Sequence, residues 1–374
     1  MPEWRPKISR EILTNRQLNR ATLARQMLLA RSDISIPDAV RFLGGLQAQQ
    51  SNDPYIGLWT RLRGFGHEQL TALIVDKTLA RATTMRGTLH LHTANDLVGF
   101  RALVQSYLMS TWRSGFRKRF AGQDEAAVHR EGLKLLKKGP TTIGAVGKAL
   151  HEKFPEAEAL ALGMMMQMRE TLIQVPPTRI WGNGAPPLLL RAEQWLGKLK
   201  PTLSRIDVVR RYLAAYGPAS INDMQAWCRL TKLSAEFKVL EKELVVFEGE
   251  DGRVLYDLPD APRPDADTPA PVRFLPLYDN AYLGYDNRRR MLDEADMKRL
   301  NLFSDFKPAV LIDGVIAAGW VVSRKKGVAR LEIEPYHKVT KAQRREVETE
   351  GERFLRFMEE DADSYEVEVT AVRT

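Results

Sequence analysis

Two glutamines, Gln47 and Gln49, stand two positions apart in the run 46–50 (Leu-Gln-Ala-Gln-Gln). On a helix, side chains at this spacing point to different sides, whereas on an extended segment they share one side. The glycine pair at 44–45 and the Ser-Asn-Asp-Pro stretch at 51–54 predict a break in helical structure, so both amides can converge on one ligand. An amide does not titrate near neutral pH, so it cannot act as a general base, but it can orient a water molecule. A helix end with two surface amides is the structural alternative.

A second run, residues 84–91 (Thr-Met-Arg-Gly-Thr-Leu-His-Leu), predicts a strand, a glycine turn and another strand. Arg86 lies next to the turn glycine, so we expect its guanidinium to point outward, toward a phosphate or the minor groove of DNA. Thr88 and His90 follow on the second strand as further candidate DNA contacts. His90 and His92 alternate with leucines and share one face, with a polar sheet surface as the alternative. Because no third His or Cys ligand is nearby, we predict no metal site.

The run 278–290 mixes tyrosines, amides and arginines in a predicted loop. Such a mixture suits base stacking and phosphate contact together. The same composition also occurs in structural crossovers that Asp and Asn turns hold in place. The candidate DNA contacts of this loop are Asp279, Asn280, Arg288 and Arg289.

A hairpin tip is predicted between a strand that ends at Ser323 and a strand that starts at Val328. The tip carries three consecutive cations, Arg324, Lys325 and Lys326. It is a candidate for a hairpin that probes DNA, and a solvated turn is the alternative.

The chain has 374 residues, a net charge of +9 and a pI near 9.5, and the whole positive excess lies within residues 1–120. A basic region in one part of a fold indicates a phosphate-backbone partner, although a solvated arginine-rich surface has the same composition. The single cysteine, Cys228, excludes an internal disulfide and a multi-cysteine metal site. No nucleotide or hydrolase motif is present, so we predict no cofactor. With no apolar run of membrane-spanning length and no secretory signal, we expect a cytoplasmic protein.

Helix caps and turn signals divide the chain into three helical units and a tail. The first unit, 1–120, is predicted to hold helices that begin near residues 14, 35 and 68 and a hairpin at 80–92. The second unit, 121–200, and the third, 201–258, repeat three helices followed by two strands. A proline-rich linker at 260–271 precedes the tail, 272–374, where short strands and one helix predict a small sheet or partial barrel. The predicted fold class is therefore α+β, with three tandem helix-turn-helix units that each carry a β-wing.

Three motifs carry a resemblance to a known family. The runs 46–50, 86–90 (Arg-Gly-Thr-Leu-His) and 277–289 (Leu-Tyr-Asp-Asn-Ala-Tyr-Leu-Gly-Tyr-Asp-Asn-Arg-Arg) resemble the AlkZ/YcaQ-like DNA glycosylases, over nearly the whole chain. These enzymes excise alkylated guanines and unhook interstrand crosslinks. The resemblance implies three winged helices with a C-terminal β-rich part, double-stranded DNA as the partner, and Gln47 and Gln49 as the catalytic pair. Relatives with an aspartate at the second position can deprotonate water, so Gln49 indicates that this chain acts on charged lesions.

The resulting prediction is a monomeric, monofunctional DNA glycosylase for cationic N7-alkylated purines, with the unhooking of crosslinks as a further activity. Such a base has a weakened glycosidic bond and leaves without a proton, so a well-placed water and suitable electrostatics suffice. The main alternative is a winged-helix transcription regulator without catalysis. Regulators usually carry one such unit and dimerise on two half-sites, and three units in one chain favour the glycosylase. A resistance protein that only sequesters DNA or a drug is a third reading.

Overall fold

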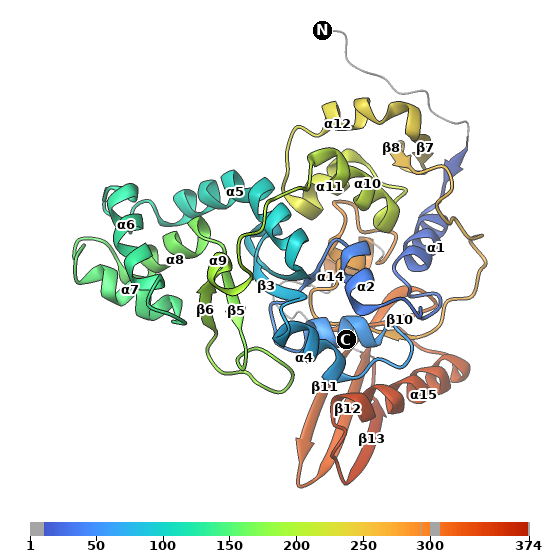
Figure 1. Cartoon of the computed structure of the whole chain (residues 1–374). Helices are drawn as coiled ribbons and strands as arrows, with labels where there is room; N and C mark the ends of the chain where they lie inside the picture. The colour runs from blue at the N-terminus through green and yellow to red at the C-terminus, as the bar shows by residue number, and fades with distance from the viewer. Residues whose placement is uncertain (1–10, 293, 300–306, 373–374) are drawn as a thin grey trace.

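The computed structural model describes residues 11–292, 294–299 and 307–372. Helical layers form the left and the top of the view in Figure 1, and a separate β-sheet with one long helix forms the bottom. The chain is thus a mixed α+β fold, as predicted. Within the described residues, none of the helices combines the length and the apolar character needed to cross a membrane.

One order of elements occurs three times: a helix, a short extended segment, two helices and two antiparallel strands. The first repeat has α2 (Ile36–Phe42), β2 (Leu46–Gln47), α3 (Asp53–Trp59), α4 (His67–Val75), β3 (Leu79–Thr83) and β4 (Leu89–Thr93). The second has α6 (Glu125–Leu136), α7 (Ile143–His151), α8 (Ala159–Arg169), β5 (Leu172–Val175) and β6 (Leu188–Arg191). The third has α10 (Arg205–Tyr216), α11 (Ile221–Cys228), α12 (Ser234–Val239), β7 (Val245–Gly249) and β8 (Val254–Asp257). In the last two repeats the extended segment is a single bridging residue, Thr141 opposite Leu189 and Ala219 opposite Tyr256.

Hydroxyl side chains begin several of these helices at the predicted places. The Oγ atoms of Ser35, Thr142, Ser204 and Ser220 each accept a backbone N–H from the first turn of α2, α7, α10 and α11. Each contact satisfies a backbone donor that the helix itself leaves unpaired. The sequence therefore sets these four helix starts locally.

The first two repeats share one sheet and are not separate layers. Its strand order is β2-β4-β3-β5-β6, and β3 pairs antiparallel with β5 through Arg81 opposite Gln174 and Ala82 opposite Ile173. A long helix that was not predicted, α5 (Ala94–Phe116), leads from β4 of the first repeat to α6 of the second. The boundary expected at residue 120 lies in the turn between α5 and α6, and it stays a prediction.

The first predicted helix exists, but it lies outside the first repeat. α1 (Asn15–Arg25) starts at the predicted cap, Thr14. Its Arg25 forms two hydrogen bonds, of 2.6 and 2.7 Å, with the buried carboxylate of Asp257 in β8, and its Arg20 pairs with Asp313 at 2.5 Å. These arginines dock α1 between the third repeat and the C-terminal sheet. The first repeat instead contains α3, a helix that was not predicted.

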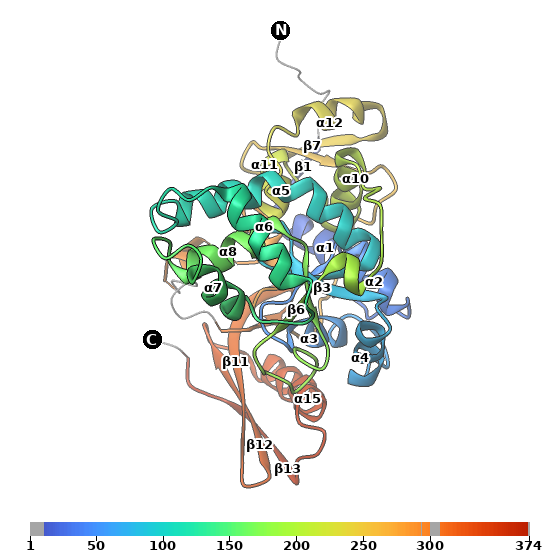
Figure 2. The same ribbon diagram turned by 60° about the vertical axis from the view of Figure 1, so that its left-hand side comes forward.

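The C-terminal part is an open sheet with strand order β13-β12-β11-β10-β9. Its strands are β9 (Arg273–Phe274), β10 (Ala309–Ile312), β11 (Val315–Lys325), β12 (Val328–Pro335) and β13 (Ser364–Val369), and only β12 and β13 pair in parallel. Helix α15 (Lys341–Met358) packs on it, with the Phe354 ring 4.7 Å from that of Phe274. Figure 2 shows the long β11 and β12 extending away from the helical layers. In the described residues the two edge strands do not pair, so a sheet and not a partial barrel forms.

Candidate active site

A pocket of about 340 Å³ brings three distant parts of the chain together. The first repeat, the end of α11 and the segment that connects β9 to β10 of the C-terminal sheet each contribute side chains. The volume lies within the usual range for small-molecule sites. The lining residues are Gln47, Arg86, Thr88, Ala226, Arg229, Tyr278, Leu283, Tyr285, Asp286 and Arg288.

A glycine pair places Gln47 at this pocket. Gly44 and Gly45 have φ angles of 66° and 98°, which side-chain-bearing residues rarely adopt. A Cβ on Gly44 would lie 2.7 Å from Trp227, and a Cβ on Gly45 would overlap the ring of His92. The backbone therefore passes close to two buried aromatic rings before it enters β2, where Gln47 pairs with His90 of β4.

Arg86 points inward and holds Gln47 in place. Its Nη2 group donates to Gln47 Oε1 at 2.7 Å and to Asn280 Oδ1 at 3.0 Å, and its Nη1 group donates to the Trp227 carbonyl at 2.6 Å. The expectation of an outward wing arginine was wrong, because these acceptors draw the side chain into the fold. Burial lowers the pKa of Arg86 to about 10, so the group remains a cation near neutral pH.

His90 supports Arg86 and is fully buried. Its Nε2 atom lies 3.1 Å from Arg86 Nη2. A guanidinium has only donors, so Nε2 must accept and shares one of the two Nη2 hydrogens with Gln47 or Asn280. The proton is then on Nδ1, which donates to the Thr88 carbonyl at 3.1 Å. Burial, and next the Arg86 charge, hold the pKa of His90 well below its usual value. A direct DNA contact by His90 does not fit this burial, nor does a polar surface.

The two glutamines differ in their surroundings. Gln47 is 7% exposed and lines the pocket, whereas Gln49 is exposed in the bend after β2 and is not among the lining residues. The Ala48 N–H group donates to the Leu89 carbonyl at 2.8 Å, so the extended pairing reaches the residue between them. The expected break after the helix is therefore present, and α2 ends at Phe42. The joint action of the two amides stays a prediction.

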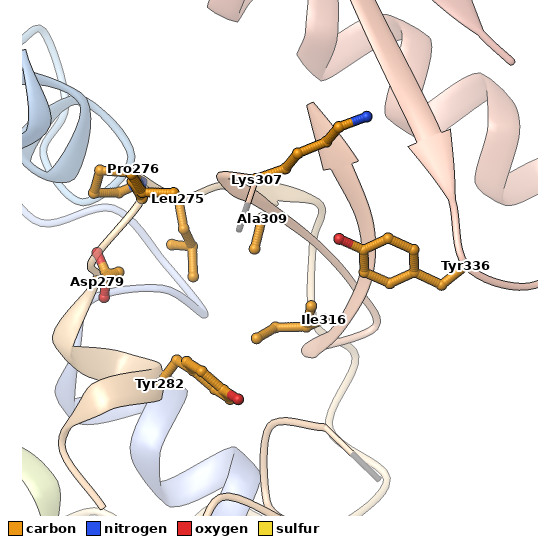
Figure 3. Close-up of a pocket in the computed structure, with 9 residues that line it drawn as sticks. Leu275, Pro276, Asp279, Tyr282, Lys307, Ala309, Ile316 and Tyr336 are labelled. Carbon is orange, nitrogen blue, oxygen red and sulfur yellow. The ribbon is translucent and has the colours of Figure 1, made fainter. Parts of the chain in front are cut away.

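Asp279 is a structural residue. Its carboxylate accepts two hydrogen bonds from Arg61, of 2.7 and 2.8 Å, and caps α13 (Asn280–Leu283). It lines a different, much smaller pocket, where Pro276 and Asp279 lie on one side and Lys307 and Tyr336 on the other (Figure 3). Asp279 is buried in this ion pair, and its contact with DNA stays a prediction.

Asn280 is also buried, but it belongs to the site. Its Oδ1 atom accepts from Arg86 and its Nδ2 group donates to the Gly45 carbonyl at 3.2 Å. One amide thus ties the arginine to the glycine turn that precedes Gln47. In the free protein Asn280 thus has a positioning role, and its contact with DNA stays a prediction.

The remaining predicted cations divide into two groups. Arg288 lines the pocket and stacks over the Tyr282 ring at 4.8 Å, and Arg289 is exposed beside it. The strand β11 continues two residues beyond the predicted end, so Arg324 and Lys325 pair with β12 and the turn lies at Lys326 and Gly327. Lys325 and Lys326 are exposed, and Arg324 pairs with Asp361 at 2.6 Å. This hairpin lies at the opposite end of the molecule from α11 and α12 in both views (Figures 1 and 2), and it does not line the pocket.

Six residues that line the pocket were not among the predicted site residues: Ala226, Arg229, Tyr278, Leu283, Tyr285 and Asp286. Tyr278 and Asp286 stand inside a run already singled out, and the acid among its arginines was a usable signal. The sequence held no signal for Arg229. This residue ends α11 with a positive φ of 63°, and no motif in the sequence marks that position. In the described part of the chain, no group of three His, Cys, Asp or Glu side chains could hold a metal ion.

Comparisons with known proteins agree with the three motifs. The family model described as DNA glycosylase AlkZ-like matches residues 40–357. An interstrand DNA cross-link repair glycosylase of Streptomyces sahachiroi is 26% identical over 229 residues, which are 59% of this chain and 62% of that protein, less than two thirds of its length. The solved Streptomyces sahachiroi DNA glycosylase AlkZ shares the fold, with a TM-score of 0.76 over 96% of this chain and 100% of that one at 20% identity. Because the family model covers most of its length, this chain belongs to the AlkZ-like family of DNA glycosylases.

Proposed function

We propose that this protein is a monofunctional DNA glycosylase that hydrolyses the N-glycosidic bond of cationic N7-alkylated purines. We further propose that it unhooks interstrand crosslinks joined through such bases. The observation that carries the proposal is the contact between Arg86 and Gln47 inside a pocket of about 340 Å³. It fixes an uncharged amide where a base and its sugar would enter.

The contact sets what the Gln47 amide can do. Arg86 uses up one acceptor site of the carbonyl oxygen, and the second lone pair and the NH2 group remain for a water or a sugar. An N7-alkylated purine carries its own positive charge and departs without a proton. A water that the amide holds near the sugar carbon then meets the main need of the reaction. We assign Gln49 as the second member of this pair, at the exposed edge.

The residues that line the pocket support the proposal of monofunctional action. A lyase forms a Schiff base through an amine, and among the described residues that line the pocket there is no lysine. The three repeats support double-stranded DNA as the partner, because we interpret each repeat as a winged helix. Together with the exposed cations, these repeats offer the DNA a basic surface. The base would leave the stack to reach Gln47. We also propose that the protein acts as a monomer.

The test is an excision assay on defined duplexes. The protein is incubated with a duplex that contains one N7-methylguanine, or one N7-linked crosslink, and alkali then cleaves each abasic site. We expect strand cleavage at the lesion only after alkali. A protein that binds a consensus sequence in a selection from random duplexes and releases no base would be the transcription regulator instead.

A substitution of Gln49 gives a more specific test of the proposed mechanism. Gln49→Asp places a carboxylate that can take a proton from water. If water activation limits the rate, this variant keeps its activity on N7-methylguanine and gains activity on a neutral lesion such as hypoxanthine. Loss of both activities would show that the amide itself is needed at this position.

A further inference from the structure

Asp286 contributes the sole carboxylate among the described residues that line the Gln47 pocket. The other charged lining residues are three arginines: Arg86, Arg229 and Arg288. Asp286 is exposed, and in the described part of the chain its carboxylate has no hydrogen bond or ion pair. A carboxylate beside three cations normally pairs with one of them, so an unpaired one at the mouth of a pocket is available to a ligand.

The backbone of Asp286 is held firmly although its side chain is free. The N–H groups of Asp286 and Asn287 donate to Asp223 Oδ1 at 3.0 and 3.1 Å. Asp223 is fully buried and shares the cap of α11 with Ser220. The loop is thereby fixed to the start of the helix whose other end supplies Ala226 and Arg229 to the pocket. Asp286 therefore stays at one place on the rim.

The three arginines that line the pocket would repel a cationic base, and Asp286 offsets this repulsion. Three arginines attract the phosphates on either side of an extruded nucleotide, but they repel a positively charged base and the positive charge that develops on its sugar. Arg86 is already engaged by Gln47, Asn280 and the Trp227 carbonyl. One carboxylate on the rim offsets this repulsion at the point where the base passes.

We propose that Asp286 selects positively charged bases and stabilises the developing positive charge on the sugar. This inference rests on the proposed glycosylase function and adds a specificity-determining residue to it. A neutral base gains nothing from this carboxylate, so its effect depends on the charge of the lesion. Shape-based recognition by the pocket walls would not show that dependence.

The experiment compares Asp286→Asn with Asp286→Glu and with Asp260→Asn, an exposed acid outside the pocket. Each protein is titrated with two duplexes that contain uncleavable abasic-site analogues, a cationic pyrrolidine and a neutral tetrahydrofuran. The wild type should prefer the pyrrolidine, and Asp286→Asn should lose about tenfold of that preference, equivalent to about 1.4 kcal/mol. Asp286→Glu and Asp260→Asn should keep it. The release rate of N7-methylguanine should fall by a similar factor in Asp286→Asn alone.

The outcomes separate this inference from the proposed function. If the wild type releases N7-methylguanine and Asp286→Asn retains both the rate and the pyrrolidine preference, Asp286 has no such role and the glycosylase function stands. If the wild type releases no base, both fall. A parallel loss of affinity for both analogues in Asp286→Asn would indicate a structural role and would also overturn the inference.

Discussion

Arg86 Nη2 lies 2.7 Å from Gln47 Oε1, although 38 residues separate these two positions in the chain. Because the guanidinium has no acceptor, the Gln47 amide must turn its oxygen toward Arg86. The same nitrogen also contacts Asn280, from a third part of the chain. One arginine thus fixes the orientation of the candidate catalytic amide.

Removal of the Gln47 amide should slow excision without weakening DNA binding. We expect Gln47→Ala to lower the single-turnover release of N7-methylguanine at least tenfold, about 1.4 kcal/mol in barrier. Gln49→Ala should act in the same direction. Affinity for undamaged duplex should stay the same, because amides release no counterions. Gln50→Ala, at a neighbouring exposed glutamine, is the control and should be active. Normal release by both active-site variants would refute the catalytic assignment.

Arg86 should act on the rate and not on the salt dependence of binding. Arg86→Lys keeps the charge but cannot donate to Gln47, Asn280 and the Trp227 carbonyl together. We expect release of N7-methylguanine to fall at least tenfold and the slope of log Kd against log salt concentration to be unchanged. Arg289→Lys, at an exposed position, should behave as the wild type. A changed slope in Arg86→Lys would mean that Arg86 meets phosphate after all.

The hairpin tip should show the reverse pattern. A Lys325→Ala and Lys326→Ala double variant removes two exposed charges. If the tip contacts the DNA backbone, affinity falls and the salt slope decreases by about 0.9 for each lost contact. The melting temperature should not change, because both side chains are solvated. Equal salt slopes for the double variant and the wild type would leave the tip a plain solvated turn.

Asp53 predicts a pH dependence of stability. Burial raises its pKa to about 7, and its carboxylate accepts the Gln50 N–H at 2.8 Å. The unfolded chain ionises this group near pH 4, so the unfolded state gains relative stability as pH rises from about 4 to about 7. The free energy of unfolding should decrease over this window by at most about 4 kcal/mol relative to Asp53→Asn. Urea unfolding of both proteins at pH 4.5 and 7.5 measures the difference, and parallel profiles would contradict the shift.

Gly45 should resist substitution more strongly than a glycine with free space around it. Both Gly45 and Gly64 have positive φ angles, of 98° and 63°, but only Gly45 faces a ring, that of His92. Gly64→Ala should cost about 1 kcal/mol for the backbone alone. Gly45→Ala adds the overlap with His92 and should cost at least about 2 kcal/mol, with slower excision because Gln47 moves. Equal costs in chemical denaturation would show that the close approach to His92 is unimportant.

Local patterns in the sequence determined much of the fold. Ser35, Thr142, Ser204 and Ser220 begin their helices because a hydroxyl cap needs only the next three residues. The hairpin with Lys326 and Gly327 at its tip follows from turn chemistry, since both residues have positive φ. Gly44, Gly45 and Pro54 likewise predicted that the helix before Gln47 ends ahead of the two glutamines.

Only the tertiary structure decided which side chains meet. Arg25 and Arg86 both look like surface cations in the sequence, yet a buried carboxylate and a ring of buried acceptors draw them inside. The shared sheet of the first two repeats depends on β3 and β5, which are about 90 residues apart. Such pairings rest on burial and on hydrogen-bond acceptors from distant segments, and no local pattern records them. For the same reason the place of Asp286 on the rim of the pocket became visible only in the fold.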